Sequence, residues 1–149
     1  MQGLHLTADL RDCRGDPLLM SDGQALRALC LAAVTQAGLL AVGELFHRFA
    51  PAADASSQSG VTGVVLLAES HLAVHTWPER SGVTLDVYVC NFSTDNSSKA
   101  EKLLDDLIGG VSPDRELVIR DYLDAAGPER SMFEVLDDLA AISSAELVD

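Results

Sequence analysis

The chain has 149 residues, of which 48% are apolar, and a formal net charge of −13 at neutral pH. This length favours a single domain, residues 1–149, and so negative a charge argues against nucleic acid as a partner. There is no apolar run of about 18 residues, as a membrane-spanning helix needs, and residues 1–10 lack the basic and apolar segments of a signal peptide. Three cysteines leave one unpaired in any disulfide scheme, which favours a cytoplasmic protein.

The first part of the chain is predicted to form a strand, a helix, a second strand and a loop, at residues 3–10, 21–39, 39–49 and 50–60. Alternation of apolar and polar residues indicates the first strand. In the helix, apolar residues recur every three or four positions, Ser21 or Asp22 can act as the N-cap, and Gly38 lies near the end. Small and polar residues indicate the loop.

The second part is predicted to add strands at 61–68, 71–77, 83–92 and 115–123, a helix at 94–110 and a short helix at 131–142. Residues 61–68 are apolar at almost every position, which predicts a strand buried on both faces. Pro78 and Gly82 suit a turn. Thr94 or Asp95 can cap the longer helix, and a pair of glycines can end it.

Strands and helices that do not strictly alternate predict an α+β fold, with helices on one face of a mainly antiparallel sheet. Such a sheet leaves its other face bare. Since residues 61–68 are predicted to need cover on both faces, a symmetric homodimer that stacks sheet on sheet into an α/β sandwich is expected.

Ser70, His71 and His75 stand together in a strand-like segment, which raises the question of a reactive site. The G-x-S-x-G turn of many hydrolases is absent around Ser70. Residues four apart on a strand are about 13 Å apart, so His71 and His75 predict no shared metal ion. Taken alone, such residues are most simply hydrogen-bonded core residues, and Cys30 is inert packing. Cys90 ends a strand, where a thiol can react.

Residues 60–79, GVTGVVLLAESHLAVHTWPE, followed by LDVYVC, closely resemble the core motif of the bacterial S-adenosylmethionine decarboxylases. The segments HLTADLRDC and FHRFAP extend the resemblance over residues 3–92. Members of this family make a covalent pyruvoyl cofactor from an internal serine. The resemblance implies autocatalytic cleavage between Glu69 and Ser70, giving a β chain of residues 1–69 and an α chain of residues 70–149 that begins with the pyruvoyl group.

The resemblance also implies a role for each motif residue in the chemistry. The hydroxyl of Ser70 attacks the carbonyl of Glu69, Thr62 hydrogen-bonds the intermediate, and His75 removes the α-proton of Ser70. The pyruvoyl group then forms a Schiff base with the substrate amine and takes up electrons during decarboxylation. Cys90 is the acid that protonates the product carbon.

Three further residues are implied to contact the substrate. Glu79 matches a glutamate that holds the ribose hydroxyls, and Phe49 matches an aromatic residue that stacks on adenine. Asp9 stands where the first strand often has glutamate. Without the resemblance, Glu79 would be interpreted as a surface carboxylate and Phe49 as a core ring.

The chain departs from the family pattern near these positions. The loop at 52–59 is longer than usual, Arg80 and Ser81 replace an aromatic residue and a glycine, and Asn91 follows Cys90. Some family members have shifted to L-ornithine or L-arginine, so these substrates remain an alternative. The presence of Phe49 and Glu79 favours S-adenosylmethionine, whose decarboxylated product donates aminopropyl groups in spermidine and polyamine synthesis.

A catalytically dead regulatory relative is the other alternative. Such a protein would be expected to lack Ser70, His75 or Cys90, and the chain has all three. The sequence therefore favours a self-processing decarboxylase without a metal ion.

Overall fold

The computed structural model describes residues 2–50 and 59–123. Within them an antiparallel sheet has the strand order β2-β3-β4-β5-β1-β6. The strands are β1 (Gly3–Arg11), β2 (Ala41–Arg48), β3 (Val61–Leu67), β4 (Ser70–Trp77), β5 (Gly82–Cys90) and β6 (Arg115–Leu123). The helix predicted at 131–142 and almost all of the loop at 52–59 lie outside the described residues.

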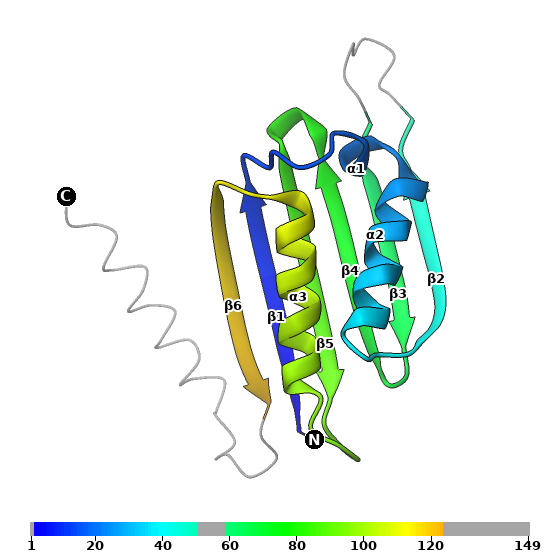
Figure 1. Ribbon diagram of the computed structural model, residues 1–149, viewed down its shortest axis with the longest axis vertical. Helices are drawn as coiled ribbons and strands as arrows, with labels where there is room; N and C mark the ends of the chain where they lie inside the picture. Colours follow the sequence, from blue (N-terminus) through cyan, green and yellow to red (C-terminus); the bar gives the residue numbers. More distant parts are fainter. Residues whose placement is uncertain (1, 51–58, 124–149) are drawn as a thin grey trace, which may run out of the picture.

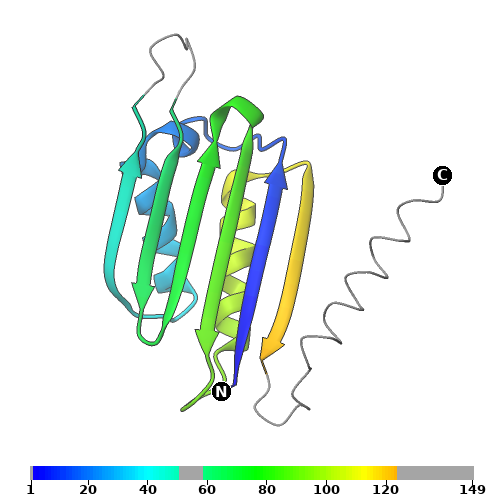
Figure 2. The same ribbon diagram turned by 180° about the vertical axis from the view of Figure 1, so that it is seen from behind.

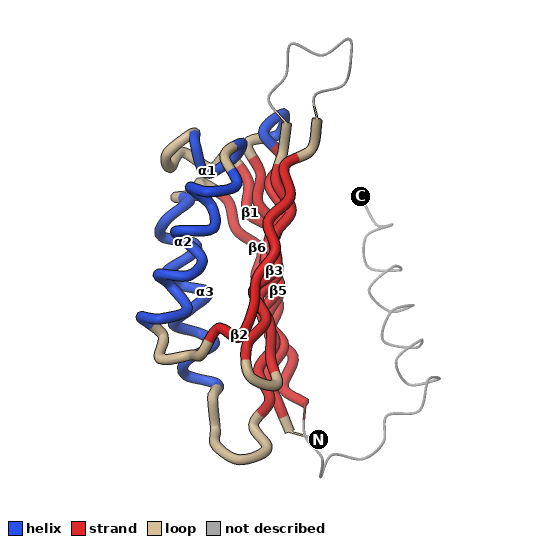
Figure 3. Tube along the Cα trace, turned by 90° about the vertical axis from the view of Figure 1, so that its right-hand side faces the viewer, coloured by secondary structure: helices blue, strands red, loops and turns tan. Residues whose placement is uncertain are grey.

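All described α-helices cover the same face of the sheet (Figures 1 and 3). They are α1 (Leu18–Ser21), α2 (Gly23–Gln36) and α3 (Ser97–Val111), and a 3₁₀ turn, η1 (Pro78–Arg80), joins β4 to β5. None of these helices combines the length and the apolar composition that crossing a bilayer requires. The predicted α+β fold, with helices on one face of an antiparallel sheet, is confirmed.

Each strand of the sheet interior divides its side chains between two faces, because successive residues of a strand point in opposite directions. In β1, Leu4, Leu6 and Leu10 are fully buried beneath the helices, while His5, Thr7 and Asp9 are partly exposed on the other face. We call this second face the open face, since no described segment covers it (Figure 2).

The prediction that residues 61–68 are buried on both faces is wrong for the single chain. Val61, Val65 and Leu67 of β3 are buried, but Leu66 is 51% exposed and Val64 is only partly buried. The physical reason is that the described helices all lie on one side. The apolar residues on the open face therefore have no cover within the described part of the chain.

The helix boundaries differ from the predicted ones at several ends. The helix predicted at 21–39 is α2, which begins after Asp22 and ends earlier, at Gln36. Asp22 is its N-cap, its Oδ1 accepting hydrogen bonds from the N–H groups of Gln24 and Ala25 at 2.8 and 3.1 Å. The short helix α1, which precedes Asp22, was not predicted. The second predicted helix begins at Ser97, after the predicted caps, and continues past both glycines to Val111. β2 and β5 are each shorter than predicted.

Thr76 fastens β4 to both β3 and α1, and it supplies a test of the core. Its buried hydroxyl accepts a hydrogen bond from Val61 N–H at 2.8 Å and donates one to Met20 O at 2.6 Å. Thr76→Val keeps the shape but leaves both backbone groups unsatisfied, so we expect a loss of about 2 kcal/mol in the free energy of unfolding in urea. Thr76→Ser keeps the hydroxyl and should lose about 1 kcal/mol for its methyl group. Equal stability of Thr76→Val and the native chain would contradict this.

Candidate active site

Ser70 lies directly after a tight turn and beside the end of β5. The turn joins β3 to β4, and its second residue, Glu69, has a φ of +58°. A residue with a β-carbon adopts this left-handed conformation at a cost of about 1–2 kcal/mol. The Oγ of Ser70 accepts a hydrogen bond from the N–H of Cys90 at 3.2 Å. The fold thus places the predicted nucleophile against the backbone of Cys90, the residue predicted to be the acid, and next to a strained residue at the predicted cleavage bond.

The other two cysteines are far less suited to chemistry. None of the three forms a disulfide. Cys30 is fully buried in α2, and burial raises the pKa of its thiol to about 12, which confirms the prediction of inert packing. Burial also raises the pKa of Cys13. Cys90 is the cysteine that contacts Ser70.

Thr62 and His75 form a second pair, on the open face. They are directly opposite each other on β3 and β4, and the Oγ1 of Thr62 lies 2.6 Å from Nδ1 of His75. On its other side His75 is opposite Thr84 of β5. The pairing of β3 with β4 therefore brings together the two residues implied to assist cleavage.

Two adjoining hollows, one of them lined by His75, contain the residues implied to bind substrate. Phe49, His75 and Glu79 line a hollow of about 240 Å³. Glu79, in η1, also lines a larger one of about 640 Å³, together with Trp77 and Asp9. Ligand pockets typically have volumes of about 300–1,000 Å³, so the larger hollow has room for a nucleoside.

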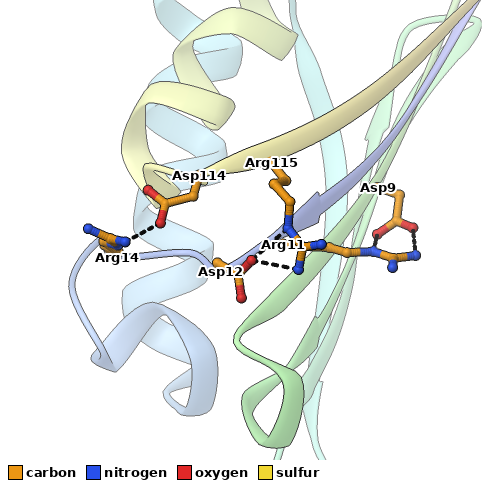
Figure 4. A network of polar contacts seen from close by, with 6 residues as sticks. All are labelled: Asp9, Arg11, Asp12, Arg14, Asp114 and Arg115. Atoms are coloured by element: carbon orange, nitrogen blue, oxygen red, sulfur yellow. Dashed lines mark hydrogen bonds and ion pairs between the residues drawn. The ribbon is translucent and has the colours of Figure 1, made fainter.

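The carboxylate of Asp9 in this hollow is paired with Arg11 (Figure 4). Arg11 donates to it at 2.8 Å, and this hydrogen bond holds the pKa of Asp9 below its ordinary value. The next residue along, Asp12, pairs with Arg115 at 2.7 Å. The second pair ties the end of β1 to the start of β6, and a ligand at Asp9 would contact an ion pair.

Ser70 and His75 lie far apart in the single chain, although both were predicted to act in one cleavage reaction. Ser70 is the first residue of β4 and His75 is the sixth, and a rise of about 3.3 Å per residue separates them by about 16 Å. Glu69, Ser70 and Cys90 form one group, which we call the serine end. A second group lies toward the opposite end of the sheet, which we call the histidine end. It consists of Phe49, Thr62, His75, Glu79 and Asp9.

A polar cluster that the sequence did not predict lies near the middle of the open face. Asp86 of β5 lies between two imidazoles, His5 Nε2 at 2.9 Å and His71 Nε2 at 3.1 Å. The ring of Tyr88 stacks on His71 with centroids 5.7 Å apart. Strand alternation places all four side chains on one face, but only the neighbourhood of β4, β5 and β1 shows that they meet.

Comparison with known proteins identifies the family of this chain. The family model described as S-adenosylmethionine decarboxylase matches residues 4–112. The chain belongs to the S-adenosylmethionine decarboxylase family. This match ends before β6, which completes the sheet beside β1.

Several curated members of the S-adenosylmethionine decarboxylase family are similar to the chain, each named S-adenosylmethionine decarboxylase proenzyme. The protein of Aquifex aeolicus (strain VF5) is 38% identical over 113 residues, covering 76% of this chain and 74% of the relative. That of Symbiobacterium thermophilum is 37% identical over 109 residues, covering 73% and 76%. That of Pyrococcus horikoshii is 33% identical over 103 residues, covering 69% and 68%.

A solved structure of the same family has the same fold. The crystal structure of the adenosylmethionine decarboxylase from Aquifex aeolicus VF5 matches with a TM-score of 0.71 and 32% identity, covering 88% of this chain and 98% of that one. The predicted family is thereby confirmed.

Proposed function

We propose that this chain is the proenzyme of a pyruvoyl-dependent S-adenosylmethionine decarboxylase, a carboxy-lyase. It cleaves itself between Glu69 and Ser70 and then converts S-adenosylmethionine to its decarboxylated form, the aminopropyl donor for spermidine and other polyamines. The observation that carries the proposal is the contact of Ser70 Oγ with the backbone of Cys90, directly after the strained Glu69, in a chain of this family.

Cleavage uses only the chain's own atoms. Ser70 Oγ attacks the carbonyl carbon of Glu69, the peptide C–N bond breaks, and the hydroxyl proton passes to the freed amine, leaving an ester. Removal of the α-proton of Ser70 then breaks the Cβ–Oγ bond, so that the oxygen leaves with the carboxylate of Glu69. Hydrolysis with loss of ammonia leaves the pyruvoyl group at the start of residues 70–149. The strain at Glu69 favours the first step, because breaking the peptide bond relieves it.

The pyruvoyl group supplies a ketone that condenses with the substrate amine and withdraws the electrons left by loss of carbon dioxide. Cys90 holds the proton that the product carbon must receive. A thiol is acidic enough to give a proton to a carbanion. Its place beside Ser70 supports this role, because the cofactor forms from that residue.

A second copy of the chain supplies Thr62 and His75 to each Ser70, so that the active enzyme is a homodimer stacked through its open faces. The distance of about 16 Å between Ser70 and His75 along β4 supports this arrangement, since a base must lie within hydrogen-bond reach of the proton it removes. Apolar side chains on the open face support it too, because Leu45 is 69%, Leu117 61% and Ile119 57% exposed, and a sheet-on-sheet dimer would bury them.

The contact between Thr62 and His75 suits proton removal. When Nδ1 of His75 carries the hydrogen and donates it to Thr62 Oγ1, Nε2 is left as the free base. Thr62 can then donate its own hydrogen to the oxyanion that forms during attack on Glu69. The 2.6 Å separation of Oγ1 and Nδ1 supports a hydrogen bond between the two side chains.

The hollows at the histidine end hold the nucleoside of the substrate. Phe49 stacks on the adenine, and Glu79 accepts hydrogen bonds from the ribose hydroxyls. The side chain of Phe49 is 52% exposed, and its ring meets the ring of His47 edge to face. Asp9 contacts the substrate in the larger hollow, where its carboxylate is paired with Arg11. The relatives described above are all named for S-adenosylmethionine, which favours it over ornithine or arginine. We place the enzyme in the cytoplasm, where its three free thiols stay reduced.

Carbon dioxide release distinguishes the candidate substrates. Purified, cleaved protein given S-adenosylmethionine, L-ornithine and L-arginine in turn should prefer the first by roughly 100-fold or more in kcat/KM, because only this substrate uses the nucleoside contacts. Faster release from ornithine or arginine would establish the shifted substrate instead. Release from none of the three would identify a regulatory relative.

A further inference from the structure

The loop between β5 and α3 is built around the backbone of Cys90. Asn96 donates a hydrogen bond from Nδ2 to Cys90 O at 3.0 Å. Asn91 braces Asn96, because its Oδ1 accepts a hydrogen bond from Asn96 N–H at 2.8 Å. Asn91 is itself held by a bond from its N–H to Gln2 O at 2.9 Å and by one from its Nδ2 to the Oγ of Ser97 at 2.9 Å.

The side chain of Asn96 does not cap its helix and instead donates a hydrogen bond to the backbone of Cys90. It is the N-cap of α3, where an asparagine side chain normally accepts a hydrogen bond from the first turn, but its side chain makes no such bond. Asp95 serves the N–H of Ser97 instead, with its Oδ1 at 2.9 Å. The side-chain amide of Asn96 therefore donates its hydrogen bonds to two backbone carbonyl groups, those of Cys90 and Thr94.

Cleavage changes the second side-chain contact to the backbone of Cys90, the one made by Ser70. Before cleavage, its N–H donates to Ser70 Oγ. In the reaction proposed above, this oxygen leaves residue 70 with the carboxylate of Glu69, so the N–H loses its acceptor on that residue. The bond from Asn96 to Cys90 O involves no atom that the reaction moves.

We propose that Asn96, braced by Asn91, is a positioning residue for the proton donor of the decarboxylase. This proposal rests on the proposed function and on the role of Cys90 in it. Cys90 is the last residue of β5, where strands fray, and proton delivery to carbon requires a donor fixed to within a fraction of an ångström. Asn96 keeps the thiol in place once Ser70 no longer supports the backbone beside it.

The test uses the cleaved enzyme and two substitutions at one position. Asn96→Leu has nearly the shape of asparagine but cannot donate, and Asn96→Ala removes the side chain. We expect both to cleave completely, to lose about 10- to 100-fold in kcat, and to change KM for S-adenosylmethionine by less than about twofold. Alkylation of Cys90 by iodoacetamide, followed by mass spectrometry, should be about threefold faster or more because the thiol is less confined. Cys13 in the same sample is the internal reference and should not change.

Asp95→Ala is the matched control, because it removes one side-chain bond to the backbone of the same loop without touching Cys90. Its kcat and its Cys90 alkylation should stay within about twofold of the native enzyme. The proposal is overturned if Asn96→Leu leaves kcat unchanged, or if Asp95→Ala lowers kcat as much. Failure of the native chain to cleave or to release carbon dioxide would instead refute the proposed function, and the alkylation of Cys90 would still report on Asn96.

Discussion

A Ser70→Ala chain is expected to remain a single species of 15.8 kDa and to release no carbon dioxide from S-adenosylmethionine. Alanine has no hydroxyl to attack the carbonyl of Glu69, and without cleavage no ketone forms at residue 70. Intact mass and a denaturing gel measure the cleavage, and trapping of the carbonyl with borohydride measures the cofactor. The native chain should give two fragments, residues 1–69 and 70–149.

Cys90→Ala is the control for this experiment, because it removes a reactive side chain at the same end of the sheet. Its backbone N–H still reaches Ser70 Oγ, so it should cleave, but we expect at least about a 100-fold loss in kcat without the proton donor. Fragments from Ser70→Ala would refute the role of its hydroxyl. Normal turnover by Cys90→Ala would assign the proton to another residue.

Co-expression of Ser70→Ala with His75→Ala is expected to restore cleavage that neither variant shows alone. In a mixed dimer, the intact His75 of the Ser70→Ala chain lies beside the intact Ser70 of its partner copy. Random pairing makes about half of all dimers mixed, so about half of the His75→Ala chains should be cut and the Ser70→Ala chains should all stay whole. Different affinity tags on the two chains allow each to be followed by mass spectrometry.

The matched control pairs Ser70→Ala with a chain that carries Ser70→Ala and His75→Ala together, which contains no intact serine and should give no fragments. Absence of fragments from the first mixture as well, in preparations shown to contain mixed dimers, would mean that His75 serves the Ser70 of its own chain. The distance between them would then have to close by a rearrangement of β4. Cleavage restored in the mixture distinguishes a shared site from a site within one chain.

Much of the local structure could be predicted, because it depends on residues close together in the sequence. β6 occupies residues 115–123 as predicted from its apolar pattern. Asp22 was one of two predicted caps and is the N-cap of α2, since an aspartate side chain reaches the N–H groups two and three residues ahead. The motif around Ser70 and His75 indicated the family, because its residue types follow the needs of one reaction.

Predictions failed where a distant part of the chain decides the outcome. α3 begins later than predicted because Asn91 and Asn96 hold the preceding loop against the end of β5, and that contact cannot be recognised from helix periodicity. Within the described part of one chain the open side of β3 has no cover, and the second copy predicted to supply that cover stays a prediction.

The sequence by itself determined which residues can carry the chemistry. It also determined the alternation of apolar and polar residues along the strands, which gives the sheet an apolar face toward the helices. Both depend on side-chain type and on the geometry of a few consecutive residues. Only the tertiary structure decided that Ser70 lies beside Cys90 and that Thr62 lies opposite His75. The reason is that strand order and register come from long-range pairing, including the insertion of β1 between β5 and β6, whose free energy depends on packing against the helices.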